Sequence, residues 1–154
     1  MEKQSTFLVT HADAASAVLK DADDGQVHTL AENPDLDAND ALDATVASDE
    51  LGVTWELVDI EERRPLTTGE SEEPPTSQER ELAAEGDEGD VTTRERAGVG
   101  EIHVLTVPPE RVADAVSDVL DDEATLVRAA RLGVNRVEVR SDGEAGVVSV
   151  RYLP

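Results

Sequence analysis

The apolar residues of this chain fall in short blocks in which Val, Leu and Ile alternate with polar residues. Alternation with a period of two is typical of β-strands that bury one face. The turn-forming residues between the blocks separate one expected strand from the next. The chain is therefore expected to fold mainly as short strands around small apolar cores.

Acidic residues surround these blocks, with 36 Asp and Glu against 13 Lys and Arg and a formal net charge of -23. Such a charge with low hydrophobicity would indicate disorder, but 38% hydrophobic residues in regular blocks predict folded domains with an acidic surface. Lys3 and Lys20 are the only lysines. An acidic, lysine-poor surface suits multimolar KCl, where a Debye length of about 3 Å screens repulsion between carboxylates. We therefore expect a halophilic protein. The alternative, an acidic protein of an ordinary cell, is disfavoured by the even spread of the acids.

The chain contains no cysteine, which excludes disulfides and thiolate metal sites. Its first residues, MEKQSTFLVTHADAAS, lack a basic segment followed by a long apolar stretch. No apolar run approaches the ~18 residues of a membrane helix. We expect a cytoplasmic protein with no membrane partner.

The composition changes twice along the chain. Residues 65–98 are polar and carry three of the seven prolines, which predicts an acidic flexible linker with short helices at most. Thr76-x-x-Glu79 and Thr92-x-x-Glu95 both have the spacing of a helix capping box. A structureless segment this long is unusual inside one compact domain. Two small domains are therefore expected, over residues 1–64 and 99–154.

The N-terminal domain contains five expected strands: Thr6–Thr10, Ser16–Lys20, Gln26–Ala31, Ala41–Ala47 and Val53–Arg63. Five short strands without a helix predict a small five-stranded β-barrel, because closure removes exposed strand edges. The segment from Asn33 to Val46 resembles the turn and strand of oligonucleotide-binding barrels. The expected core consists of alternate residues: Phe7, Val9, Val18, Leu30, Leu42, Val46, Trp55 and Leu57.

The C-terminal domain has the expected order strand, helix, helix, strand, strand. Strand Glu101–Val107 is followed by an amphipathic helix that begins near Pro109 and by a second helix over Glu123–Leu132. Asn135–Arg140 and Val147–Leu153 then predict a hairpin. The expected architecture is a three-stranded sheet with two helices, which makes the whole chain an α+β protein.

Five arginines of the C-terminal domain are the candidate site for nucleic acid or another anion: Arg128, Arg131, Arg136, Arg140 and Arg151. Arg136 and Arg140 share one strand face with Glu138 by the period of two, and Arg151 joins that face from the partner strand. The alternative is that carboxylates such as Glu138 neutralise these arginines across the sheet. The sequence favours this alternative.

Histidines offer weak candidates for a metal site, because His11 and His28 could meet across a sheet beside Asp13. A single histidine on a strand is more often a surface or half-buried residue. No nucleophile elbow, phosphate-binding loop, dinucleotide fingerprint or HExxH motif occurs. We therefore expect no enzymatic activity, no cofactor and no metal.

The chain resembles a family of haloarchaeal proteins in its opening TFLVTHAD, in DDGQVHTLAENP and in residues Trp55–Arg64. The C-terminal segments EIHVLTVP, RAARLGVNRVEVR and VVSVRYLP carry the same resemblance. The family implies no activity. The leading expectation is a non-catalytic protein that binds RNA or single-stranded DNA through its N-terminal barrel. The alternative is a protein–protein adaptor with no nucleic-acid role.

Overall fold

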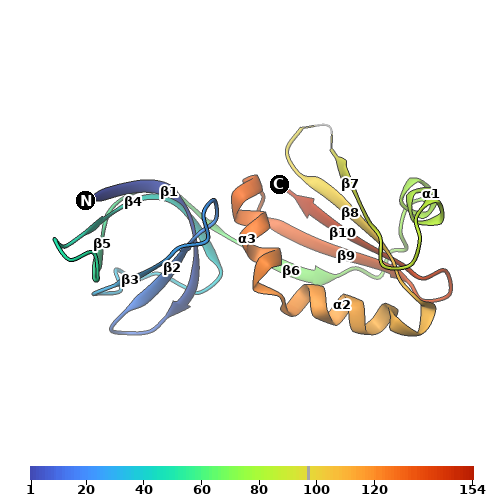
Figure 1. Ribbon diagram of the computed structural model, residues 1–154, viewed down its shortest axis with the longest axis horizontal. Coiled ribbons are helices and arrows are strands. Elements are labelled where there is room, and N and C mark those ends of the chain that lie inside the picture. The colour runs from blue at the N-terminus through green and yellow to red at the C-terminus, as the bar shows by residue number, and fades with distance from the viewer. Residues whose placement is uncertain (97) are drawn as a thin grey trace. The chain divides into compact units, whose positions relative to one another are not determined.

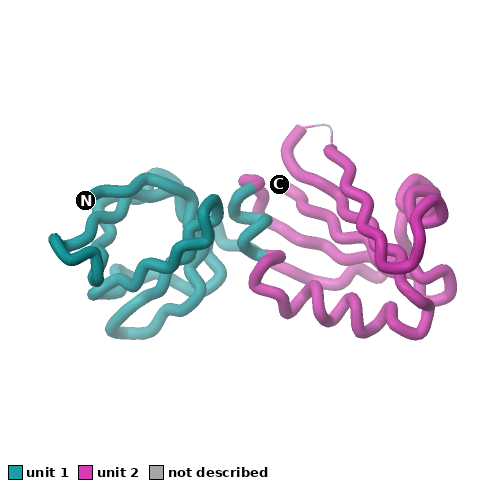
Figure 2. The backbone as a smooth tube through the Cα atoms, in the orientation of Figure 1, with its two compact units in different colours: residues 1–66, 126–131 teal, residues 67–125, 132–154 magenta. Residues whose placement is uncertain are grey.

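The computed structural model describes residues 1–96 and 98–154, which form ten strands, three α-helices and one short 3-10 helix. The protein is therefore of the α+β class. Its backbone divides into two compact units (Figure 2). The first comprises Met1–Leu66 with Leu126–Arg131, and the second comprises Thr67–Thr125 with Leu132–Pro154.

The first unit is built from five strands: β1 (Glu2–Ala12), β2 (Ala17–Asp21), β3 (Val27–Leu30), β4 (Asp40–Ser48) and β5 (Trp55–Pro65). They pair in the closed ring order β1-β2-β3-β5-β4 (Figure 1). Every pair is antiparallel except β3 with β5, where Leu30 lies opposite Trp55. The five strands expected from alternation are all present.

The core of the first unit lies inside this ring. Phe7, Leu19, Leu30 and Leu42 are almost fully buried, and β1 and β4 bring Phe7 directly opposite Leu42. The expected core residue Val18 is only half-buried, because the inward face of β2 carries Ala17, Leu19 and Asp21 instead. Val18 lies on the same face of β2 as Lys20, whose ammonium group requires solvent. The strand is therefore more stable when it buries its other face. Leu57 is also half-buried, packed against the core rather than inside it.

The second unit is built on a five-stranded sheet: β6 (Thr67–Glu70), β7 (Val91–Glu95), β8 (Glu101–Thr106), β9 (Arg136–Asp142) and β10 (Val147–Leu153). The strands lie in the order β6-β9-β10-β8-β7, with β6 parallel to β9 and the other pairs antiparallel. Helix α1 (Ser77–Glu85) contacts β8 and β10, whereas α2 (Val112–Asp121) contacts β9 and β10. The 3-10 helix η1 (Pro109–Arg111) leads into α2.

The expected flexible linker over residues 65–98 is corrected by the structure, because this segment contains β6, α1 and β7. The expected three-stranded sheet therefore has five strands. The sequence predicts a linker here because β6 and β7 are mostly exposed and lack an apolar alternation. Edge strands need no such alternation when backbone pairing to a neighbour holds them. The capping box at Thr76 and Glu79 begins α1 as predicted, whereas Thr92–Glu95 lies in strand β7.

Helix α3 (Glu123–Leu132) contributes its residues Leu126–Arg131 to the first unit. There the buried Arg64 donates from Nη2 to the carbonyl oxygen of Ala130, over 3.1 Å. None of the helices in residues 1–96 and 98–154 is long and apolar enough to cross a membrane.

Candidate functional site

Three of the candidate arginines surround one carboxylate in the second unit. On β9, Arg136 and Arg140 lie two residues either side of Glu138, so all three side chains share a face. The register of β9 and β10 places Arg151 opposite Glu138. The guanidinium nitrogens lie 3.9 Å (Arg136), 2.6 Å (Arg140) and 3.2 Å (Arg151) from the Glu138 carboxylate. We call these four residues the Glu138 cluster.

Within the cluster, two arginines are neutralised and the third is open to solvent. Burial tends to raise the pKa of Glu138, but hydrogen bonds and charge from Arg140 and Arg151 lower it overall, so the carboxylate stays ionised. The Arg140 pKa is raised by its hydrogen bond to Glu138, and its Nη2 atom also lies 2.8 Å from Glu73. The Arg140 and Arg151 side chains are 15% and 18% exposed, whereas that of Arg136 is 57% exposed. Arg136 is therefore the accessible cation of the cluster.

The two remaining candidate arginines, Arg128 and Arg131, lie on α3 in its part that belongs to the first unit. The five predicted arginines therefore belong to two different units. The sequence predicted the shared face of Arg136, Arg140 and Arg151 correctly, because that face follows from strand periodicity and hairpin pairing alone.

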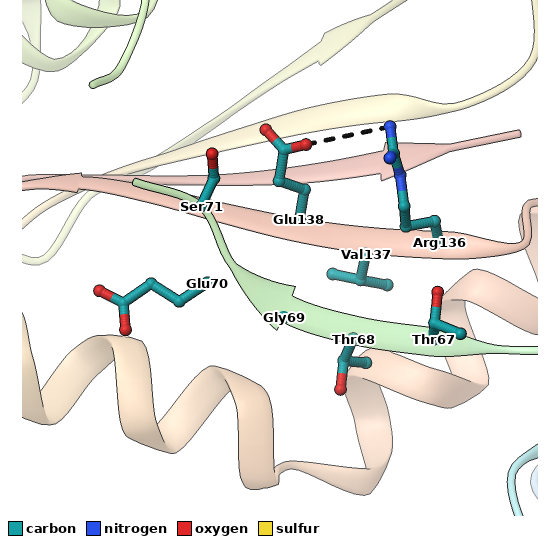
Figure 3. Close-up of a pocket in the computed structure, with 8 residues that line it drawn as sticks. All are labelled: Thr67, Thr68, Gly69, Glu70, Ser71, Arg136, Val137 and Glu138. Atoms are coloured by element: carbon teal, nitrogen blue, oxygen red, sulfur yellow. Dashed lines mark ion pairs between the residues drawn. The ribbon is translucent and has the colours of Figure 1, made fainter. Parts of the chain in front are cut away.

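A shallow hollow of about 290 Å³ opens beside the cluster, above the edge strand β6 (Figure 3). Its lining comes from two neighbouring parallel strands and the residue that follows β6: Thr67, Thr68, Gly69, Glu70, Ser71, Arg136, Val137 and Glu138. A Cβ atom at Gly69 would meet no other atom within 4 Å. The hollow therefore exists partly because Gly69 has no side chain. No sequence motif indicated it, since β6 was not predicted as a strand.

Sequence reasoning also missed a buried polar contact under α1. Glu79 is 2% exposed. Its carboxylate accepts hydrogen bonds from the hydroxyl groups of Ser149 and Thr76 and from the backbone amide of Thr76. Burial raises its pKa, but these hydrogen bonds and the charge of Arg151 lower it overall. The capping-box spacing pointed to Thr76, whereas Ser149 lies 70 residues away in the chain. This contact attaches α1 to the centre of the sheet.

The two candidate metal-binding histidines are not brought together. His28 is buried on β3, with its ring centroid 4.4 Å from that of Trp55, and its Nε2 atom lies 3.0 Å from Lys3 Nζ. His11 is exposed on β1 and contacts the hydroxyl group of Thr10. Across residues 1–96 and 98–154, no group of three or more His, Cys, Asp or Glu side chains is arranged to hold a metal ion. His28 instead forms part of an ion-pair network in which Lys3 bridges Asp21 and Asp24, each at 2.9 Å.

This network predicts an acid-sensitive first unit. Burial and the charge of Lys3 lower the pKa of His28 below its usual value of 6.5, so the unfolded chain binds a proton more readily than the folded one. The free energy of unfolding is expected to decrease as the pH falls from 6.5 through the lowered pKa. Thermal unfolding followed by Trp55 fluorescence measures this pH dependence. The range from about pH 8 to pH 5 lies above the pKa values of most carboxyl groups, so few of them titrate within it. His28→Gln should reduce the dependence, and an unchanged slope in that variant would contradict the assignment.

The fold and its side chains define an α+β protein with a ring of five strands, a mixed five-stranded sheet and an arginine–glutamate cluster. The chain belongs to a family of unknown function, DUF5812, which matches it over residues 3–141. Searches of curated proteins and of solved structures found no match for the chain.

Proposed function

We propose that this chain is a non-catalytic protein-binding module of a halophilic cytoplasm, and that its first unit is a small barrel of the oligonucleotide-binding type used to contact a protein partner. The closed strand order with a parallel β3–β5 pair supports this type of barrel. Such barrels bind their ligands on strands 2 and 3 and on the loops that follow strands 1 and 4. The composition of that surface is therefore the main guide to the ligand.

Apolar side chains are exposed on this surface. Leu51 and Val53, in the loop between β4 and β5, are 84% and 71% exposed, and Val27 at the start of β3 is 60% exposed. Leu30, the last residue of β3, pairs with Trp55, the first residue of β5, so Val27 precedes that pair by three residues on the strand next to β5. We call Val27, Leu51 and Val53 the apolar patch. Exposed apolar clusters bounded by polar residues mark interaction sites in soluble proteins, and this patch is the observation that carries the proposal.

Acidic residues border the apolar patch and specify the kind of partner. They are exposed on the turn between β2 and β3, on the loop after β4 and on β5: Asp23, Asp24, Asp49, Glu50 and Glu56. A partner with an apolar centre and a rim of Arg or Lys is complementary to this surface in charge and polarity. Salt screens the rim charges, so at high salt the apolar contact supplies the affinity and the charges supply selectivity.

Nucleic-acid binding, the leading expectation from the sequence, has less support from the geometry. Sequence-tolerant binding of single strands relies on exposed aromatic rings, but Phe7, Trp55 and Tyr152 are 0%, 8% and 4% exposed. Affinity for phosphate also falls steeply with salt. The arginines Arg140 and Arg151 already contact carboxylates. An apolar protein contact is compatible with high salt, which strengthens apolar association.

The proposal is tested by capturing partner proteins on the immobilised chain, with and without nuclease treatment. The capture is carried out in about 2 M KCl, where salt screens the interactions between charges. The captured protein is then titrated against the wild type, against Leu51→Ser/Val53→Ser and against Val58→Ser. Val58 is a matched control because it is 53% exposed on β5 outside the patch. We expect nuclease-resistant binding that weakens about tenfold or more in the double variant and is unchanged in the control. Binding that is lost with nuclease, or equal loss in both variants, would overturn it.

A further inference from the structure

Strand β6 forms an open edge of the sheet in the second unit. It is the terminal strand of the sheet order, and all four of its residues are exposed. The amides of Thr67 and Ser71 donate to the carbonyl oxygens of Asn135 and Val139, toward β9. In a parallel pair both backbone groups of a residue point to the same side, so those of Thr68 and Glu70 point away from β9. These outward groups are able to pair with another extended chain.

Arg136 and Glu138 line the hollow on the same side of the sheet as Gly69, and Thr68, Glu70 and Val137 line it from the other side (Figure 3). The register places Thr67 beside Arg136 and Gly69 beside Glu138, so the small residue leaves space next to the cluster. A strand added beyond β6 would project alternate side chains on this same side of the sheet. One of them would lie over Gly69, between the neighbouring residues Thr67 and Ser71.

The charged groups beside the hollow indicate which kind of side chain from the added strand would bind there. Arg140 and Arg151 contact the same Glu138 oxygen at 2.6 Å and 3.2 Å, whereas Arg136 lies 3.9 Å from the other and remains 57% exposed. A guanidinium group forms its strongest contacts with a carboxylate, through two parallel hydrogen bonds. Arg136 is therefore able to accept a second carboxylate without releasing Glu138 from its other partners.

We propose that β6 is a docking edge for an extended peptide segment of a partner protein. The segment adds to the sheet through the outward backbone groups of Thr68 and Glu70. It places an Asp or Glu side chain over Gly69 against Arg136. This mode combines sequence-independent backbone pairing with one side-chain pocket for selectivity. The site belongs to the second unit, whereas the apolar patch belongs to the first.

The test begins with a library of random seven-residue peptides, displayed on phage and selected on the full-length chain. We expect enrichment of sequences that place an Asp or Glu among β-branched residues. A labelled peptide from this set is then titrated by fluorescence anisotropy. Changing its acidic residue to the corresponding amide should weaken binding about tenfold. Failure to enrich such sequences, or equal binding of the amide peptide, would overturn the proposal.

Variants of the chain locate the binding site. Gly69→Val adds a branched side chain beside the hollow, at a position where the new Cβ would meet no other atom within 4 Å, and valine favours the strand conformation. Gly69→Val and Arg136→Gln should each weaken peptide binding about tenfold. Gly143→Val is the matched control, because its Cβ also meets no atom within 4 Å but lies outside the hollow. Circular dichroism confirms that each variant is folded. Wild-type affinity in both site variants would place the peptide elsewhere and refute the proposal.

Two further measurements separate this proposal from others. Leu51→Ser/Val53→Ser should bind the peptide like the wild type, because those residues belong to the first unit. The two proposals therefore fail independently. Sedimentation of the chain alone tests self-association. A dimer that Gly69→Val disrupts would make a second copy of this chain the occupant and would overturn the assignment to a partner protein.

Discussion

Replacing Glu79 by alanine is expected to lower the free energy of unfolding of the second unit by about 2–4 kcal/mol, because it leaves a buried hydroxyl group without its acceptor and weakens the cap of α1. Glu79 is 2% exposed and accepts hydrogen bonds from Ser149 and Thr76. Its removal leaves the buried Ser149 hydroxyl without this acceptor and takes a negative charge from near Arg151. It also removes the reciprocal half of the α1 capping box.

Denaturant unfolding followed by two probes measures this effect. Far-ultraviolet circular dichroism reports on both units, whereas the fluorescence of Trp55 reports on the first unit. The alanine variant should shift the circular-dichroism transition to lower denaturant and leave the Trp55 transition in place. Glu81→Ala, at an exposed position of the same helix, is the control and should have little effect. Equal stability of the two variants would show that the buried carboxylate does not hold α1 to the sheet.

The second large effect is expected in the core of the first unit. Phe7 is fully buried, lies opposite Leu42 across β1 and β4, and contacts the edge of the His28 ring at a centroid distance of 5.7 Å. Phe7→Ala should therefore lower the free energy of unfolding by about 3–5 kcal/mol, since it removes buried apolar area and leaves a cavity in the ring.

The Trp55 fluorescence transition in denaturant gives this value directly, because Trp55 belongs to the same apolar core. Phe7→Leu preserves most of the volume and should cost less than about 1.5 kcal/mol. Val58→Ala, on the exposed side of β5, should have little effect. A loss in Phe7→Ala no larger than in Val58→Ala would contradict the position of Phe7 in the core.

Much of the fold was predictable because alternation is a local property. A strand such as β4 buries alternate residues over most of its length, with Leu42, Ala44 and Val46 inside the ring, and its sequence shows that period directly. The α1 capping box was predictable for the same reason, since Thr76 and Glu79 are neighbours in the chain. Local patterns of this kind identify elements and their buried faces.

The candidate site was predictable to the extent that it depends on one hairpin. The shared face of Arg136, Arg140 and Arg151 follows from the periods of β9 and β10 and their pairing. The hollow above Gly69 was not predictable. It requires β6, a polar four-residue strand without an apolar pattern, to lie parallel to β9 about 70 residues later in the chain. Parallel pairing between distant segments leaves no local signal in either one.

The sequence by itself determined the acidic composition, the strand-rich α+β class and the residues able to form the cores, because charge and periodicity are read residue by residue. The tertiary structure alone decided that Thr67–Glu70 and Val91–Glu95 complete a sheet, that Ser149 meets Glu79, and that Glu138 leaves Arg136 open. These outcomes depend on which distant segments pair. That choice is made by the free energy of the whole fold, in which each backbone group and buried charge must find a partner.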